Sequence, residues 1–551
     1  MTLTEEEFLF QTDLQHLFTV NLESENWTLV YHSFRDVRQN GAFFSALAPN
    51  EKVPSILQKE SWDVSIGGGS PSVWVSNKDG EEVSEYHNYT EAGQIQPIVL
   101  VRSFHKIRPS YFEIQEEFRL FHNLYYDKAK NKYIKIDEDG NEEDIVLVED
   151  KTVRIRTRAL REYAAIKDMS IAFFVDSVRY SPIVLENIPE SRRHLECHDD
   201  NKTYFVHLRE NFFLKSPDRQ TLSRFLGKRI IKSLPKERVR NWTYENEPKN
   251  YESFIVGLDE FGDRIAHSSD PDKLANYFGT NPEAPHYLTP VFFRKEVLNK
   301  YYAQPQKYEV RDGHLFCGSL WCLRMDNDNK DYVVVYLGDL GRDLSHSEQS
   351  YWKTFNIPPE GGVSKTCYIR SIAGERAYPE TPDLRFKLEL SNFKKEWERK
   401  HGWPLFLELS SKDQHLLTAL HLPTTDDQSE FDSQVLYLTK ILVDSLNETE
   451  LNKQISACPA DAKGITKLGI FLRESDNPAG ESVVSFLRNL QKLRSTGSGH
   501  RKGKDYEKVA RRFGIGNKDL QQVFSDILTD AISTLAALCN EVEIDNKLVR
   551  S

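Results

Sequence analysis

The spacing of apolar residues changes in character near residue 428. Downstream, "SEFDSQVLYLTKILVDSLNETELNKQI" repeats apolar side chains every three or four positions, at Phe431, Val435, Leu438, Leu442 and Leu446. This is the period of an amphipathic α-helix, whose apolar residues share one face. Upstream, short alternating runs between turn residues are typical of half-buried β-strands. The sequence therefore predicts a multidomain α+β protein whose β-rich N-terminal and middle regions precede an all-α bundle.

Two stretches in the first 150 residues predict β-hairpins. Asp79-Gly80 and Asp139-Gly140 each stand between segments of alternating polarity, and Asp-Gly suits a tight two-residue turn. Farther along, "KTVRIRTRALREYAAIKD" begins as a strand and becomes helical near Leu160, and "MSIAFFVDSVRYS" is typical of a buried strand. A β–α–β passage is expected here.

The remaining pattern divides the chain into three regions. "GHLFCGSLWCLRMDNDNKDYVVVYLGDLG" has two apolar runs around a polar segment, and a hairpin is its simplest interpretation. The last helical stripe is long and is expected to begin at Asn517, a good N-cap residue. Because 551 residues exceed one compact core, we expect a β-rich α+β region in one or two domains, a mixed β-rich middle domain and a helical domain: 1–304, 305–427 and 428–551.

Charge and cysteine content exclude several classes of protein. The net charge of −12 argues against a protein that coats nucleic acid over its whole surface. The N-terminus lacks the basic and apolar segments of a signal peptide, and no run of about 18 apolar residues predicts a membrane span. Six irregularly spaced cysteines fit reduced thiols. A cytoplasmic protein with no membrane partner is expected.

One stretch reverses the overall charge. Between Lys492 and Arg512, eight lysines and arginines are opposed by Asp505 and Glu507, which gives a local charge of +6. Within it, "RSTGSGH" places Arg494 and His500 with five residues between them. The simplest structural interpretation is a glycine-containing loop between helices with solvated cations. A functional interpretation is a site for a phosphate backbone.

Arginine and histidine together supply what metal-free RNA cleavage requires. The ribose 2′-hydroxyl attacks the adjacent phosphorus, so a proton must move and charge on the phosphoryl oxygens must be stabilised. Histidine titrates near neutrality and suits the first task, and the arginine fork matches phosphate oxygens. We therefore assign His500 to proton transfer and Arg494 to phosphate stabilisation, with Arg501, Lys502 and Lys504 as RNA-binding residues.

The region from 428 to 551 resembles the HEPN family, small helical bundles marked by an arginine, four to six residues and a histidine near a helix end. The apolar helix before "RSTGSGH" and the long helix after it match this layout. The family usually has a polar residue, often asparagine, after the arginine, and this chain has Ser495 there. The resemblance covers under a quarter of the chain.

The resemblance implies a metal-independent endoribonuclease that needs no cofactor and leaves 2′,3′-cyclic phosphate ends. It also implies a homodimer through the C-terminal domain, because two protomers of the family commonly build one composite site. By analogy, the chain would be a bacterial toxin or anti-phage effector that cuts RNA, with tRNA as one candidate. Its N-terminal region would then sense a phage or host protein. The alternative is a non-catalytic binding or scaffold protein that dimerises through its helices.

Other motifs have simpler structural interpretations. "RRHLECHDD" would bring His194 and His198 to one helix face for zinc, but a solvated loop is the stronger expectation. Cys317 and Cys322 lack a second ligand pair and are expected to be core thiols. "MDNDNKDY" lacks the glycine and final acid of a calcium loop. "SIGGGSP" and "YLGDLGRDL" are expected to be turns, and "EEFRLFHNLYYD" a half-buried amphipathic element. No metal site is predicted.

Overall fold

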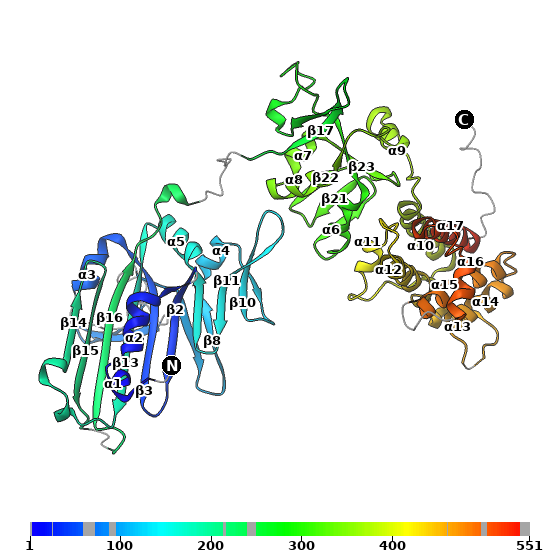
Figure 1. Cartoon of the computed structure of the whole chain (residues 1–551). Helices are drawn as coiled ribbons and strands as arrows, with labels where there is room; N and C mark the ends of the chain where they lie inside the picture. The colour runs from blue at the N-terminus through cyan, green and yellow to red at the C-terminus, as the bar shows by residue number, and fades with distance from the viewer. Residues whose placement is uncertain are drawn as a thin grey trace. The chain divides into compact units, whose positions relative to one another are not determined.

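The computed structural model describes residues 3–24, 26–58, 72–87, 95–212, 216–239, 249–459, 461–497 and 504–539. The chain forms two compact units (Figure 1). The first comprises Met1–Asp137 and Asn141–Asn246, and the second Glu138–Gly140 and Glu247–Ser551. Strands dominate the first unit and the start of the second, and helices follow. This confirms the expected mixed architecture, β-rich first and helical towards the C-terminus.

The first unit is built on one antiparallel sheet of twelve strands in the described residues. Its main order is β14-β15-β16-β13-β3-β2-β12-β11-β10-β9, with β1 beside β2 and β6 beside β3. The strands span Glu23–Ser24 (β1), Trp27–Arg35 (β2), Gln39–Pro49 (β3), Gln96–Pro97 (β6), Tyr125–Asp127 (β9), Lys132–Ile136 (β10), Glu142–Glu149 (β11), Thr152–Arg156 (β12), Met169–Ser181 (β13), His194–His198 (β14), Lys202–Glu210 (β15) and Thr221–Ile231 (β16).

Local sequence signals in this unit are confirmed. Asp79-Gly80 joins β4 (Ser72–Lys78) to β5 (Glu81–His87), and both turn residues have positive φ. β10 and β11 form the second expected hairpin. β12, helix α5 (Thr157–Ile166) and β13 give the β–α–β passage, with β2 and β3 between the two strands. A further hairpin, β7–β8, spans Val99–Phe104 and Arg108–Ile114.

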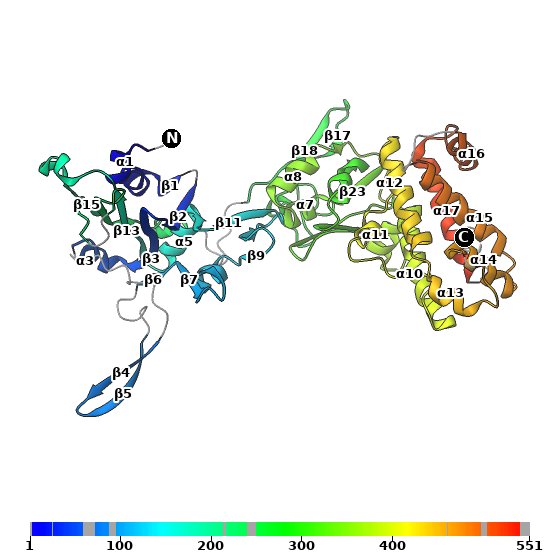
Figure 2. The ribbon, with the colours of Figure 1, turned by 90° about the horizontal axis from the view of Figure 1, so that it is seen from below.

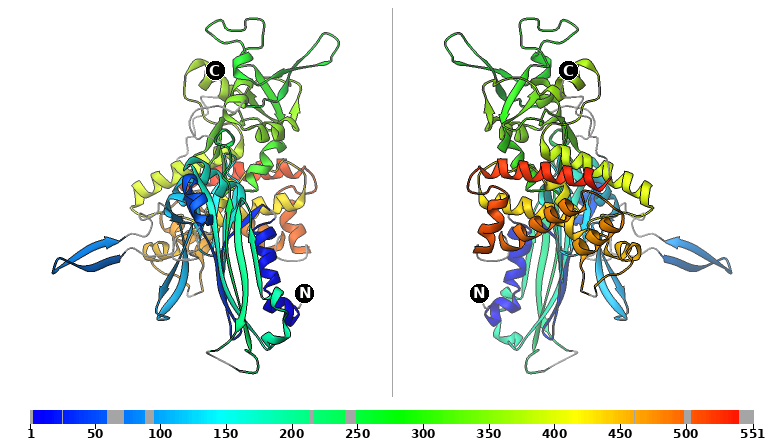
Figure 3. Two further views of the ribbon diagram at one scale, coloured as in Figure 1. Left: turned by 90° about the vertical axis from the view of Figure 1, so that its left-hand side faces the viewer. Right: turned by 90° about the vertical axis from the view of Figure 1, so that its right-hand side faces the viewer.

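Short N-terminal helices cover one face of the sheet (Figure 3). They are α1 (Glu5–Leu9), α2 (Thr12–His16) and the π-helix η1 (Leu17–Asn21). Phe18 of η1 is fully buried against Phe43 of β3 and Phe225 of β16. Arg179 of β13 donates two hydrogen bonds to the carboxylate of Asp13, at 2.5 and 2.8 Å. Odd-numbered residues of β3 and β13 therefore face these helices, because side chains alternate along a strand.

Helix α4 (Glu116–Phe121) confirms the amphipathic element expected in "EEFRLFHNLYYD". Phe118 is buried, and His122 at the helix end is only 2% exposed. The His122 ring packs edge-on against Phe118 and Phe121, and its Nε2 lies 2.9 Å from the carbonyl oxygen of Ala159. Burial lowers the pKa of His122 to about 4, although the hydrogen bond to the Ala159 carbonyl acts in the opposite direction.

We expect the first unit to lose stability as the pH falls from about 6.5 to about 4, because the unfolded chain then protonates His122 and the folded chain does not. Above pH 6.5 this residue adds no pH dependence. The loss attributable to it at pH 4 should be about 3 kcal/mol. Urea unfolding followed by circular dichroism should show a weaker pH dependence for His122→Gln than for the parent. His105 is exposed, so His105→Gln should show the same dependence of the free energy of unfolding on pH as the parent. If this dependence is equal in all three proteins, His122 is not the group responsible.

The second unit begins with three small antiparallel sheets. They contain β17 and β18, then β23, β19 and β24, then β20, β21 and β22. The hairpin expected between the apolar runs of 313–341 is wrong, because β22 and β23 belong to different sheets. An isolated antiparallel bridge joins Asp326, after β22, to Val334 of β23. The strands span Ser253–Leu258 (β17), Arg264–Ser268 (β18), Pro290–Arg294 (β19), Tyr308–Arg311 (β20), His314–Cys317 (β21), Trp321–Arg324 (β22), Tyr332–Tyr336 (β23) and Asn356–Ile357 (β24).

Two aspartates of "MDNDNKDY" are buried rather than placed at a tip. Asp326 accepts hydrogen bonds from the backbone N–H and hydroxyl of Ser364, at 2.6 and 2.8 Å. Asp328 accepts from the backbone N–H groups of Glu380 and Thr381, at 2.9 and 2.8 Å. Thr381 is the N-cap residue of α10 (Pro382–His401), so Asp328 ties the start of that helix to the β-rich part.

The glycines of "YLGDLGRDL" lie in helix α7 (Leu337–Asp343), and the expected turn is wrong. A Cβ atom at Gly338 would meet the ring of Tyr287, and one at Gly341 the backbone of Ser269. These glycines therefore permit close approach of the helix to its neighbours. The other short helices before α10 span Val53–Gln58 (α3), Asn299–Tyr302 (α6), His346–Lys353 (α8) and Lys365–Tyr368 (α9).

The C-terminal helices share one core, which α10 joins through Trp397. They confirm the expected helical stripes and span His415–Ala419 (α11), Gln428–Thr439 (α12), Lys440–Asp444 (η9), Glu448–Gln454 (α13), Gly464–Glu474 (α14), Gly480–Gly497 (α15), Lys504–Arg512 (α16) and Leu520–Leu538 (α17). The prediction that Asn517 is the N-cap of the last helix is wrong. The N-cap of α17 is Asp519, whose side chain accepts a hydrogen bond from the backbone N–H of Gln522. Within the described residues, no helix has the length and apolar character needed to cross a membrane.

Candidate nucleic-acid interface

Helices α15 and α16 frame the basic stretch (Figure 2). The two helices contact each other, and α15 also contacts α17. α15 buries apolar side chains at helical spacing, namely Val483, Leu487, Leu490 and Leu493. α16 buries one short face, formed by Tyr506, Val509 and Ala510. Both helices therefore pack into the same core.

Arg494 lies in the last turn of α15. Its Nη1 donates a hydrogen bond to Oδ2 of Asp444, at 2.5 Å, and Asp444 is the last residue of η9. The two side chains are 28% and 41% exposed. A partly exposed ion pair of this kind contributes only about 0–1 kcal/mol to stability. Its main effect is therefore to orient the guanidinium group beside the end of α15.

The side chains of the other predicted site residues lie outside the described part of the structure. His500, Arg501 and Lys502 lie outside the described residues. Lys504 is the first residue of α16, and only its backbone is described. Of the predicted catalytic pair, the structure thus positions Arg494 alone.

Further cations are exposed on both helices. Arg488 and Lys492 lie on α15, and three cations lie on α16: Lys508, Arg511 and Arg512. Nη1 of Arg512 donates to Oδ1 of Asn489, at 2.8 Å, and so connects α16 to α15. The described ends of the basic stretch therefore present positive charge on two adjacent helices, an arrangement that can hold phosphate groups.

Sequence reasoning missed Asp444 and Asn489. Asp444 lies fifty positions before Arg494, and no local pattern connects the two. The apolar stripe of the helix before Asp444 shows which face of that helix is buried. It does not show which distant residue lies beside Asp444. Asn489 is a polar residue on an amphipathic helix, as many surface residues are, and only the packing of α16 onto α15 distinguishes it.

The histidines of "RRHLECHDD" lie in a strand, and the expected loop is wrong. β14 is the edge strand of the large sheet, and its His194, Glu196 and His198 point to one face. Nε2 of His194 lies 2.7 Å from Oε1 of Glu196. No group of three or more histidine, cysteine or carboxylate side chains in the described part of the chain is arranged to hold a metal ion.

Cys317 and Cys322 lie on the paired strands β21 and β22. Cys317 is buried, as expected of a core thiol. Cys322 is exposed, so the prediction of a core thiol is wrong for this residue. Both are free cysteines. "SIGGGSP" lies entirely outside the described residues.

Comparison of the chain with protein-family models, with curated proteins and with solved structures gave no match. The assignment of function therefore depends on the chemistry of the residues.

Proposed function

We propose that this protein is a metal-independent endoribonuclease with its active site at the junction of α15 and α16. The observation that carries the proposal is the placement of Arg494 in the last turn of α15, held by Asp444 and flanked by exposed cations on both helices. Helices α15 and α16, which precede and follow the segment that contains His500 in the sequence, pack into one core.

In this proposal His500 removes the proton from the ribose 2′-hydroxyl, the 2′-oxygen bonds to the adjacent phosphorus, and the bond between phosphorus and the 5′-oxygen breaks. The leaving 5′-oxygen takes a proton from water, and the protonated His500 then returns its proton to the solvent. Arg494 stabilises the charge that develops on the phosphoryl oxygens, because its planar fork donates to two of them. Asp444 is a positioning residue that aims the guanidinium group. Arg501, Lys502 and Lys504 hold the RNA backbone. The products are a 2′,3′-cyclic phosphate and a 5′-hydroxyl.

The remaining features of the proposal follow from the resemblance to the HEPN family. The helical part is a HEPN-like bundle, and two copies of it form a homodimer with a composite site. The protein acts in the bacterial cytoplasm as a toxin or anti-phage effector. RNA, with tRNA as one candidate, is the substrate. The first unit responds to a phage or host protein.

We expect the purified protein to cleave total RNA or tRNA in the presence of EDTA and to leave cyclic phosphate ends. Arg494→Ala should reduce the rate by about 10²–10³-fold, because it removes one charge-stabilising group. His500→Ala should reduce it by about 10²–10⁴-fold, because it removes the proton-transfer group. End analysis and gel-based rates provide the measurement. Arg399→Ala and His16→Ala, which change exposed residues elsewhere, should cleave at the parental rate.

If His500→Ala cleaves RNA at the parental rate, the proposed reaction does not take place at this site. A folded parent that cleaves no RNA, even after addition of phage lysate, would favour the non-catalytic scaffold. A strictly monomeric protein at micromolar concentration would contradict the composite site.

A further inference from the structure

The second face of the large sheet carries a row of aligned side chains, all but one of them polar. Direct cross-strand partners share a face, and the register places six residues in one line across six neighbouring strands. The line runs through Arg35 (β2), Asn40 (β3), Val178 (β13), Arg224 (β16), His207 (β15) and His194 (β14). Neighbouring strands lie about 4.8 Å apart, so the line is about 24 Å long.

This row faces away from the N-terminal helices. Its residues alternate along each strand with those that pack against α1, α2 and η1, such as Phe43, Val175 and Phe225. Helix α3 covers one end of the face through Ile56, which packs in a small cluster with Phe174 and Ile230. The part of the face that α3 does not cover contains three exposed residues of the row: Arg35, Arg224 and His207.

Positive charge exceeds negative charge along this part of the face. The cations are Arg35, Arg224, Arg209 of the neighbouring row and Lys151 after β11. The acids of these strands on this face are Asp176, 2.9 Å from Arg224, and Glu196, 2.7 Å from His194. Among the described residues, Arg35, Lys151 and Arg209 have no ion-pair partner. Burial lowers the pKa of His207, and the nearby His194 and Arg209 lower it further.

A hollow of about 640 Å³ opens on this face. Its floor is formed by small or apolar residues, namely Gly41, Ala42, Phe44 and Val178. Its rim carries Arg35, Lys151 and Arg224, together with Asp176, the ion-pair partner of Arg224. Phe44 stacks on Phe174, with ring centroids 5.4 Å apart. Phe205 lies on the same face, opposite Leu226. Apolar surface is thus bordered by three cations and one carboxylate, which leaves an excess of positive charge.

We propose that this face of the first unit binds single-stranded RNA, with phosphates along the row and bases against the apolar floor. An unstacked base presents a flat apolar ring beside a phosphate, which matches a floor of Ala42 and Phe44 below a rim of arginine and lysine. A duplex keeps its bases stacked inside and would leave this floor unfilled. An acidic peptide would match the charge but would not require the exposed ring surface.

This inference goes beyond the proposed cleavage and concerns a different surface. It assigns to the first unit the capture of the strand, whereas the α15–α16 junction carries the chemistry. Binding is measured in EDTA on full-length His500→Ala, so the result does not depend on whether that junction cleaves RNA.

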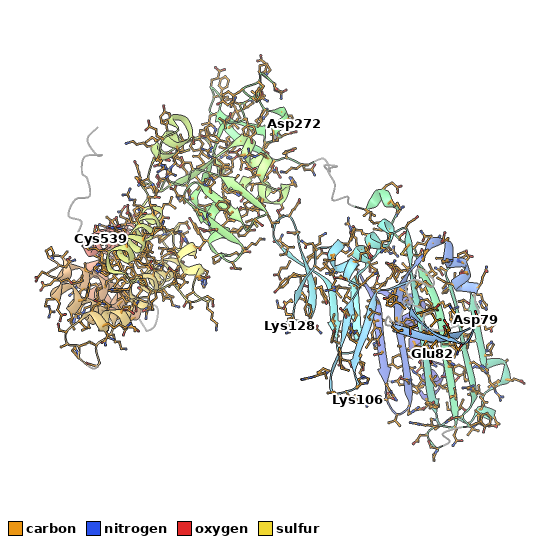
Figure 4. All side chains as sticks on the ribbon, turned by 180° about the vertical axis from the view of Figure 1, so that it is seen from behind. Asp79, Glu82, Lys106, Lys128, Asp272 and Cys539 are labelled. Atoms are coloured by element: carbon orange, nitrogen blue, oxygen red, sulfur yellow. The ribbon has the colours of Figure 1, made fainter. Side chains whose placement is uncertain are left out.

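The test is fluorescence anisotropy with a labelled 20-nucleotide single-stranded RNA, the matching duplex and polyglutamate as competitor. The variant combines Arg35→Gln with Arg224→Gln. The matched control combines Lys106→Gln with Lys128→Gln, at exposed positions labelled in Figure 4. We expect the variant to weaken single-strand binding about tenfold and to lower the log–log salt slope by about 1.4, the value for two phosphate contacts on a single strand. The control should change neither quantity, and the duplex should bind more weakly.

Three results would overturn the proposal. They are an unchanged Kd in the variant, an equal loss in the control, or duplex and polyglutamate binding as tight as single-strand binding. Photocrosslinking with bromouridine RNA provides a second readout that needs no substitution. Crosslinks in 203–209 or 222–226 support the face, and crosslinks confined to other segments contradict it.

Discussion

Asp328→Ala is expected to lower the free energy of unfolding of the second unit by about 3–5 kcal/mol. The Asp328 carboxylate is 8% exposed and accepts from the backbone N–H groups of Glu380 and Thr381. Its loss leaves two N–H groups without these acceptors at the start of α10. It also removes a negative charge near Lys295, which is buried and donates to the carbonyl of Asn327, at 2.8 Å.

The chain provides a matched control for this substitution within the same loop. Asp331 is three residues away and exposed, so Asp331→Ala should change the free energy of unfolding by no more than about 0.5 kcal/mol. Urea unfolding followed by tryptophan fluorescence would compare the two variants. Equal effects of the two substitutions would show that Asp328 does not hold α10. Hydrogen exchange of the peptide that begins at Glu380 should increase in Asp328→Ala alone.

Gly341→Ala is expected to destabilise the second unit by about 3 kcal/mol. Alanine favours a helix over glycine by about 1 kcal/mol, so propensity alone predicts a gain. The added Cβ would lie 1.8 Å from the carbonyl oxygen of Ser269, however, and neither backbone can yield without separating α7 from residues 269–271. The steric cost therefore exceeds the gain in propensity.

Gly362→Ala is the matched control, because no atom lies within 4 Å of a Cβ built there. Its free energy of unfolding should remain within about 0.5 kcal/mol of the parent. The melting temperature and urea midpoint of both variants provide the comparison. A neutral or stabilised Gly341→Ala would mean that α7 and the Ser269 segment are not in close contact in solution.

The elements that the sequence predicts well are those whose signal is local. The apolar period before and after residue 428, the Asp79-Gly80 turn and the run of β13 each express a preference of a few neighbouring residues. Misassignments occur where tertiary contacts decide. "YLGDLGRDL" contains turn residues, yet it is helical because its glycines let α7 approach Tyr287 and Ser269.

The candidate sites divide in the same way. "RSTGSGH" and its charge are visible in the sequence, but the partner of Arg494 is not, because Asp444 comes from a helix fifty residues earlier. "MDNDNKDY" shows three similar aspartates, and only packing buries Asp328 while leaving Asp331 exposed.

The sequence by itself determined the elements with a clear local period, such as β13 and the helices after residue 428, because the periods of helices and strands are properties of neighbouring residues. The tertiary structure alone decided which distant side chains meet. Arg35 and His194 share one line only through the register of six strands, and a shift of one residue in any strand would turn its side chain to the other face.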